Sequence, residues 1–273
     1  MAFVENQGAS IFYDVTGSGP ALLFLHGGGG NASSWYRQVE FFARDYTCVV
    51  IDARGFGRSH PYGADVGNLE LASSDTLAVM DALAIESAGL VCQSMGAWTG
   101  LRLSLNHPSR VWGFVGASSP MGVDYPPAIE NAFSFIQSIQ DSGLGIEDAA
   151  LSERFRTEKP EEFWLYRHLN LFNVGVIRGE ELGVPSNTTM RNLFDPAAML
   201  PLERLADMTV PSVLISGALD PLVLTSTMQT LAQHIAGAAF EVVENAGHSP
   251  YFEVPDLFNA ITARYLEQFR AKL

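Results

Sequence analysis

Short, uninterrupted apolar segments alternate with segments of helical spacing along much of this 273-residue chain. The apolar segments are residues 21–25, 47–51, 88–92 and 111–117, and the helical segments between them are 35–43, 69–83 and 95–106. A strand that is apolar on both faces is typical of a parallel sheet covered by helices on each side. Because strand–helix–strand units build such a sheet, we predict an α/β fold.

This alternation stops near Pro120 and resumes at Val213. Between these points no strand pattern is visible, whereas the apolar residues of 129–139 recur at helical spacing and Pro160 stands at a plausible helix start. Further strands are expected at 213–215 and 240–243, further helices at 225–235 and 257–273, and an initial pair of strands at 3–5 and 11–15 followed by a turn at 17–20. We therefore predict a core of residues 1–119 and 208–273 with a helical cap inserted at 120–207.

The charge balance limits the partners of the chain. Thirty acidic residues against sixteen basic ones give a formal net charge of −14, which repels nucleic acid and anionic membranes. No apolar run approaches the ~20 residues of a membrane-spanning helix, and the first ten residues lack the pattern of a secretory signal. Cys48 and Cys92 lie in apolar runs whose spacing fits no zinc site. We expect a cytoplasmic protein with two buried, unpaired cysteines.

A serine stands at the junction between a predicted strand and a predicted helix. The segment Cys92-Gln93-Ser94-Met95-Gly96 places small residues on both sides of Ser94. Such a sharp turn exposes a serine hydroxyl at the edge of a sheet, beside the N–H groups that begin the helix. Cysteine replaces the usual first glycine, but it lies two residues too early in the strand to be the exposed nucleophile. We predict that Ser94 is a nucleophile.

A serine hydroxyl needs a base, and that base needs an orienting carboxylate. Of the six histidines, only His248 lies in the loop between the last predicted strand and the last predicted helix. Imidazole exchanges protons at neutral pH because its usual pKa is about 6.5. Asp220 follows the strand at 213–215 and reaches the same sheet edge, with Asp124 as the alternative acid. The resulting order Ser94, Asp220, His248 predicts a catalytic triad.

The run His26-Gly27-Gly28-Gly29-Gly30 follows the strand at 21–25. Glycines let backbone N–H groups approach a developing oxyanion closely. We predict that the N–H groups of Gly28 and Met95 form an oxyanion hole, with Gly29 as the alternative to Gly28. The run lacks the pattern of a phosphate-binding loop, and His26 is expected to hold the loop. The glycine-rich segment 52–59 is expected to be a structural turn.

Taken together, these motifs resemble those of the capped α/β-hydrolase superfamily over nearly the whole chain. The matching segments are His26–Gly29, Asp52–Ser59, Ser94–Gly96, Gly217–Asp220 and Gly247–His248. The resemblance implies an α/β-hydrolase fold with a mostly parallel eight-stranded sheet, a helical cap, and neither a cofactor nor a metal. It leaves open whether the chain forms a homodimer.

Superfamily membership does not fix the substrate. Ser94 argues against the dehalogenases and epoxide hydrolases of this fold, which use aspartate at that position. We expect a carboxylesterase or lactonase acting on a small, largely apolar molecule. The alternatives are a C–C bond hydrolase, which would use a cap arginine as an anchor, and a noncatalytic receptor. The cap arginines are Arg154, Arg156, Arg167, Arg178 and Arg191. The candidates for the substrate pocket are Gly29, Trp98, Met121, Phe133, Ile136, Trp164, Leu222 and Ser249. For each aromatic residue among them, packing within the cap or core is the favoured interpretation.

Overall fold

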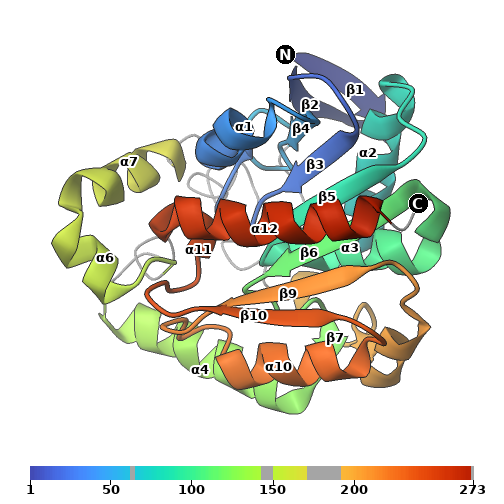
Figure 1. Cartoon of the computed structure of the whole chain (residues 1–273). Coiled ribbons are helices and arrows are strands. Elements are labelled where there is room, and N and C mark those ends of the chain that lie inside the picture. The colour runs from blue at the N-terminus through green and yellow to red at the C-terminus, as the bar shows by residue number, and fades with distance from the viewer. Residues whose placement is uncertain (62–64, 143–149, 171–191, 272–273) are drawn as a thin grey trace.

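The computed structural model describes residues 1–61, 65–142, 150–170 and 192–271. Its centre is an eight-stranded sheet with the order β1-β2-β4-β3-β5-β6-β9-β10 (Figure 1). The strands are β1 (Ala2–Asn6), β2 (Ala9–Thr16), β3 (Ala21–Leu25), β4 (Thr47–Ile51), β5 (Ala88–Gln93), β6 (Val111–Ala117), β9 (Ser212–Gly217) and β10 (Ala239–Val243). β2 pairs antiparallel with β1 and β4, and every other pair is parallel. The predicted mostly parallel, eight-stranded sheet is confirmed.

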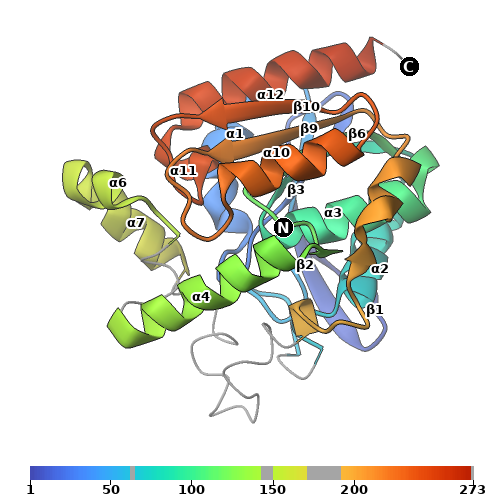
Figure 2. The same cartoon turned by 90° about the horizontal axis from the view of Figure 1, so that it is seen from below.

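Helices cover both faces of this sheet. They are α1 (Tyr36–Phe42), α2 (Leu69–Ala82), α3 (Met95–Asn106), α10 (Thr225–His234), α11 (Pro250–Glu253) and α12 (Pro255–Arg270). Figure 2 shows α12 on one face of the sheet and α3 and α10 on the other. Successive side chains of a strand point to opposite faces, so Leu23 packs into the apolar cluster beside α3 and Phe24 into the cluster beside α12. Burial on both faces explains why the strands are apolar throughout.

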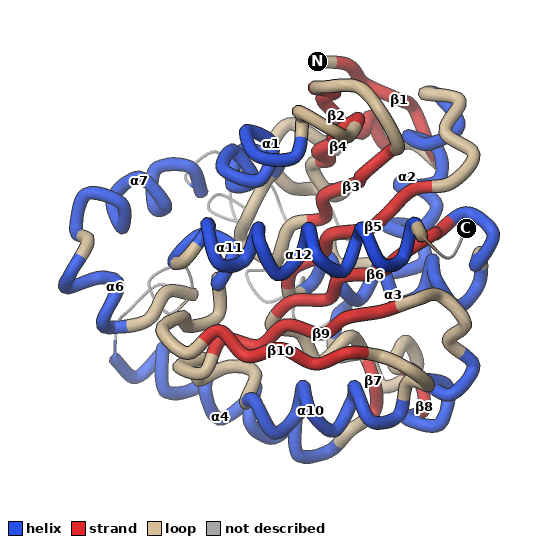
Figure 3. The backbone as a smooth tube through the Cα atoms, viewed as in Figure 1, coloured by secondary structure: helices blue, strands red, loops and turns tan. Residues whose placement is uncertain are grey.

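The chain between β6 and β9 adds helices beyond one end of the sheet. The helices described there are α4 (Pro126–Ser142), α6 (Glu153–Glu158) and α7 (Pro160–Asn170), and Figure 1 shows α6 and α7 next to α11. The expectation of no strand in this segment was wrong, because β7 (Val123–Asp124) pairs parallel with β8 (Leu200–Pro201), apart from the main sheet (Figure 3). Two-residue strands are too short to show any periodicity. The division into core and cap stays a prediction.

The remaining differences from the expected elements lie at the ends of helices and strands and in the short helix α11, which was not expected. The helix expected at 35–43 begins with the 3-10 turn η1 (Ala32–Trp35), which Asn31 caps by accepting a hydrogen bond from the N–H of Ser33. The final helix begins at Pro255 rather than Leu257. Two further 3-10 turns are η2 (Pro108–Arg110) and η4 (Leu202–Asp207). Across the described ranges no helix has the length and apolar character needed to cross a membrane.

Candidate active site

Ser94 lies between the end of β5 and the start of α3, in a strained backbone conformation. Its φ of 48° and ψ of −117° are unusual for a residue with a side chain, and such strain is typical of functional turns. A Cβ atom at Gly96 would lie 2.1 Å from the carbonyl oxygen of Leu25, so only glycine lets α3 approach β3 this closely. Cys92, which precedes the turn, is fully buried within β5. The turn thus forms with cysteine in the first glycine position.

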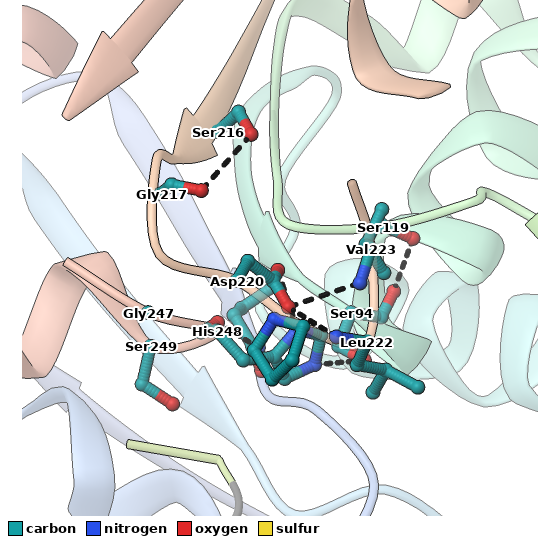
Figure 4. Close-up of polar contacts among 12 residues, drawn as sticks. Ser94, Ser119, Ser216, Gly217, Asp220, Leu222, Val223, Gly247, His248 and Ser249 are labelled. Atoms are coloured by element: carbon teal, nitrogen blue, oxygen red, sulfur yellow. Dashed lines mark hydrogen bonds and ion pairs between the residues drawn. The ribbon is translucent and has the colours of Figure 1, made fainter. Parts of the chain in front are cut away.

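The structure brings the side chains of Ser94, His248 and Asp220 together (Figure 4). Nδ1 of His248 lies 2.8 Å from Oδ2 of Asp220, and Nε2 of His248 lies 3.0 Å from Oγ of Ser94. Because the Asp220 carboxylate can only accept, Nδ1–H donates to it and Nε2 is left to accept from the Ser94 hydroxyl. Asp124, the alternative acid, is exposed on β7.

The loops that carry Asp220 and His248 are in direct backbone contact. They follow β9 and β10, neighbouring parallel strands whose carboxyl ends meet at one sheet edge. The N–H of Leu219 donates to the carbonyl of Ala246 at 2.9 Å. A Cβ atom at Gly217 would lie only 2.0 Å from the carbonyl oxygen of Gly247. Asp220 is further fixed because its Oδ1 accepts the N–H groups of Leu222 and Val223, each at 2.9 Å.

The glycine-rich loop after β3 carries the other predicted group. Met95 is the first residue of α3, so its N–H has no partner inside the helix. Gly28 is exposed, and no atom lies within 4 Å of the position that a Cβ would take there. Gly29 has a φ of +83°, a conformation that favours glycine. The oxyanion-hole role of these N–H groups stays a prediction.

His26 joins this loop to the neighbouring one. Its Nε2 accepts the N–H of Ala53 at 2.9 Å, so its Nδ1–H donates to the carbonyl of Gly27 at 2.8 Å. Burial lowers the pKa of His26 below its usual value, although the carboxylate of Asp52 opposes that shift. A neutral imidazole is the form that can make both bonds. The geometry agrees with the expected loop-holding role.

The segment 52–59 also serves the local structure. Asp52 is fully buried and accepts the N–H of Ala32 at 2.7 Å and the guanidinium of Arg58 at 2.7 Å. Arg54 forms a buried ion pair with Asp75 at 2.6 Å. The first contact ties η1 to the loop after β4, and the second ties that loop to α2. Asp52 and Arg54 thus both make contacts that hold neighbouring elements together.

The predicted pocket residues occupy different environments. Ser249 and Leu222 are neighbours of His248 and Asp220 in sequence, and Ser249 is fully buried. Trp98, buried in α3, packs edge-on against Phe194 with the ring centroids 5.2 Å apart. The others are the buried Met121, the half-buried Ile136 and two residues more than half exposed, Phe133 and Trp164. Their contact with a substrate stays a prediction.

The cap arginines considered as anchors are equally varied. Arg154 pairs with Glu158 at 3.0 Å, and Arg167 lies over the ring of Trp164. Arg156 in α6 is half-buried, and Arg178 and Arg191 lie outside the described residues. Two of the five, Arg154 and Arg167, therefore lie in contacts at the surface of the cap helices.

Three buried polar residues near the candidate triad were not predicted. Oγ of Ser119 donates to the carbonyl of Ser94 at 2.7 Å, and Nε2 of Gln93 donates to the carbonyl of His248 at 2.9 Å. Glu253 accepts the N–H of Gly247 at 2.9 Å. The only sequence signal for Gln93 and Glu253 was their position close to Ser94 and His248.

Two further observations concern the cysteine thiols and the side chains that could bind a metal. Burial raises the pKa of Cys48 to about 12 and that of Cys92 well above its ordinary value, so both are protonated at neutral pH. Among the residues that the structure describes, no three His, Cys, Asp or Glu side chains are grouped so as to hold a metal ion.

Comparison with known proteins extends the similarity over almost the whole chain. A family model described as the alpha/beta hydrolase family matches residues 22–261. A putative carbamate hydrolase RutD of Azorhizobium caulinodans is 27% identical over 266 residues, covering 95% of this chain and 96% of the relative. The 3-oxoadipate enol-lactonase 2 of Acinetobacter baylyi is 27% identical over 256 residues, covering 92% and 90%. The solved structure of Est816, described as an N-acyl homoserine lactone degrading enzyme, is 32% identical, with a TM-score of 0.75 and coverage of 96% and 98%.

Proposed function

Because the chain belongs to the alpha/beta hydrolase family, we propose that it is a serine hydrolase that cleaves an ester or lactone through an acyl-enzyme on Ser94. The observation that carries this proposal is the hydrogen-bonded series from Ser94 through His248 to Asp220, with contacts of 3.0 and 2.8 Å. This arrangement supplies a nucleophile, a base and a group that orients the base. The strained backbone of Ser94 supports the same role.

In the first half of the reaction, Nε2 of His248 removes the proton as Oγ of Ser94 attacks the substrate carbonyl carbon. The Asp220 carboxylate keeps the imidazole in the required tautomer and stabilises its charged form. The N–H groups of Met95 and Gly28 receive the oxyanion of the tetrahedral intermediate. His248 then returns the proton to the leaving alkoxide oxygen, and the acyl group remains on Ser94.

In the second half, His248 removes a proton from water, which attacks the acyl carbon. The second tetrahedral intermediate collapses, the carboxylic acid departs, and Oγ of Ser94 recovers its proton from His248. In a lactone the leaving hydroxyl stays joined to the acyl chain, so one hydroxy acid is released. All proton transfers use His248 and need no further cofactor.

The relatives support a small ester or lactone as the substrate. They include proteins described as an enol-lactonase and as an N-acyl homoserine lactone degrading enzyme. The apolar residues predicted to form the pocket favour a largely apolar substrate. We rank an ester or lactone above the C–C alternative on these grounds.

The test is a kinetic comparison of short-chain esters, aliphatic lactones and a ring-cleavage dienoate. We expect ester or lactone turnover, reduced roughly 10⁴- to 10⁶-fold in Ser94→Ala while the far-UV spectrum is unchanged. C–C cleavage with negligible ester and lactone turnover would replace the proposed substrate class. Saturable binding of these compounds without turnover would favour the receptor alternative. Full turnover by Ser94→Ala would remove the nucleophile assignment.

A further inference from the structure

Glu253 is a buried carboxylate at the end of α11, five residues after His248. Its side chain is only 2% exposed. Oε1 accepts the N–H of Gly247 at 2.9 Å, while Oε2 accepts the hydroxyl of Ser152 at 2.5 Å and the N–H of Ser152 at 3.2 Å. One carboxylate thus joins the loop that carries His248 to the residue that precedes α6.

Fold stability alone gives a weak reason for a carboxylate at this position. Across the described ranges, its hydrogen-bond partners are neutral N–H and O–H groups, and no cation forms an ion pair with it. Burial raises the pKa of Glu253, and the hydrogen bonds from Ser152 and Gly247 oppose that shift. A buried charge without a cation is costly, and an apolar side chain of similar volume often serves a fold equally well.

The backbone of Gly247 is confined from two sides. A Cβ atom at Gly247 would lie 2.8 Å from the N of Ser152 and 3.0 Å from Oε1 of Glu253. On the other side, the carbonyl oxygen of Gly247 lies so close to the backbone of Gly217, at the end of β9, that a Cβ atom at Gly217 would be 2.0 Å from it. The next residue is His248, whose ring is held by Asp220 and whose carbonyl accepts from Gln93. Glu253 supplies the fixed acceptor for the N–H of Gly247, the residue before His248.

We propose that Glu253 is a positioning residue for His248, acting through the N–H of Gly247. This inference rests on the proposed function, because it concerns how the base is held against Ser94. The contact with Ser152 anchors the same carboxylate to the cap side. The hydrogen bond from the N–H of Gly247 to Oε1 is the link between this carboxylate and the segment that carries the base.

Two substitutions at Glu253 test the proposal. Glu253→Met keeps the approximate volume and removes both acceptors. In Glu253→Gln, a nitrogen that only donates replaces one oxygen, so the N–H of either Gly247 or Ser152 loses its acceptor. We expect kcat to fall by about tenfold or more in the Met variant and by less in the Gln variant, with KM within about threefold of wild type in both.

Ser152→Ala is the matched control, because it removes the hydroxyl contacts to Glu253 and to the N–H of Phe155 at the start of α6, and leaves the bond from Gly247 to Glu253. We expect its kcat to remain within about threefold of wild type. A loss as large as that of Glu253→Met would show that the effect runs through the cap, and would overturn the proposal.

A spectroscopic readout separates positioning from general damage. The Nδ1–H of His248, hydrogen-bonded to Asp220, should give a far-downfield proton resonance that is missing from His248→Gln. In the Glu253 variants we expect this resonance to shift or broaden while the melting temperature changes little. If Glu253→Met fails to fold, Glu253→Gln is judged by the same criteria.

The proposal is overturned if the folded Glu253 variants keep a kcat within about twofold of wild type, or if the resonance is unchanged. Wild-type turnover and its loss in Ser94→Ala are measured in the same series. If wild type turns over and Ser94→Ala does not, a negative result at Glu253 removes only this inference. If Ser94→Ala is fully active, the proposed function itself fails.

Discussion

Substitution of Gly217 by alanine should disrupt the candidate triad without touching any of its three side chains. A Cβ atom at this position would lie 2.0 Å from the carbonyl oxygen of Gly247 and 2.6 Å from that of Ala246. Both obstacles are backbone atoms, so no side chain can rotate away. Real Cβ contacts are essentially never shorter than 3.0 Å, and the two loops must therefore separate by about 1 Å.

A separation of this size would pull Asp220 and His248 apart, because each lies on one of the two loops. The Nδ1–Oδ2 distance of 2.8 Å would lengthen beyond the ~3.2 Å limit of an ordinary N–H···O bond. Misplacement by ~1 Å at a reacting centre costs on the order of 100-fold in rate. Overpacking of this kind costs about 1–3 kcal/mol of stability, which most domains tolerate. We therefore expect kcat/KM to fall roughly 100-fold in a protein that still folds.

The assay is ester or lactone turnover at matched folded protein, with thermal denaturation as the measure of folding. Gly116→Ala in β6 is the control, because its Cβ would meet side-chain atoms of Phe114 and Leu214 at 3.0 and 3.1 Å. Those side chains can yield, so we expect activity within about threefold of wild type. A folded Gly217→Ala protein with wild-type kcat/KM would refute the reasoning.

Three further predictions concern buried titratable groups. Because burial lowers the pKa of His26, the unfolded chain binds a proton below pH ~6.5 that the folded chain resists, so stability falls as the pH drops. In His26→Gln, the free energy of unfolding should therefore depend less steeply on pH just below 6.5, with a slope smaller by at most about 1.4 kcal/mol per pH unit. Urea titrations at several pH values measure this slope, and an unchanged slope would contradict the prediction. Because burial raises the thiol pKa values, neither Cys48 nor Cys92 should be alkylated by iodoacetamide in native protein at pH 8, as judged by intact mass. Cys92→Ala should retain turnover, and its loss in a folded protein would return Cys92 to consideration as a reactive group.

Much of the central sheet was predictable because a strand buried on both faces is an uninterrupted apolar segment in the sequence. The strands at 21–25, 47–51 and 111–117 have the expected bounds, as does α3, which follows the turn at Ser94. The strands β7 and β8 were not predictable, because two residues carry no period. The 3-10 turn η1 was not predicted, and only its last residue, Trp35, fell within the helix expected at 35–43.

The candidate site was likewise predictable only in part. Ser94, Asp220 and His248 could be selected because each follows a strand whose carboxyl end lies at one edge of the sheet. Their polar supports could not, because their partners are distant in sequence. Gln93 bonds to a residue 155 positions away, and Glu253 to one 101 positions away. Such pairs follow from tertiary packing, for which a single sequence gives no spacing rule.

The most direct test of the account is covalent labelling of Ser94. A fluorophosphonate reacts with a serine that a neighbouring base has activated, and intact mass followed by peptide mapping locates the adduct. We predict one adduct per chain, on Ser94, with labelling abolished in Ser94→Ala and strongly slowed in His248→Gln. Folded wild-type protein that remains unlabelled, or that is labelled equally well in Ser94→Ala, would contradict the assignment of Ser94 as the nucleophile.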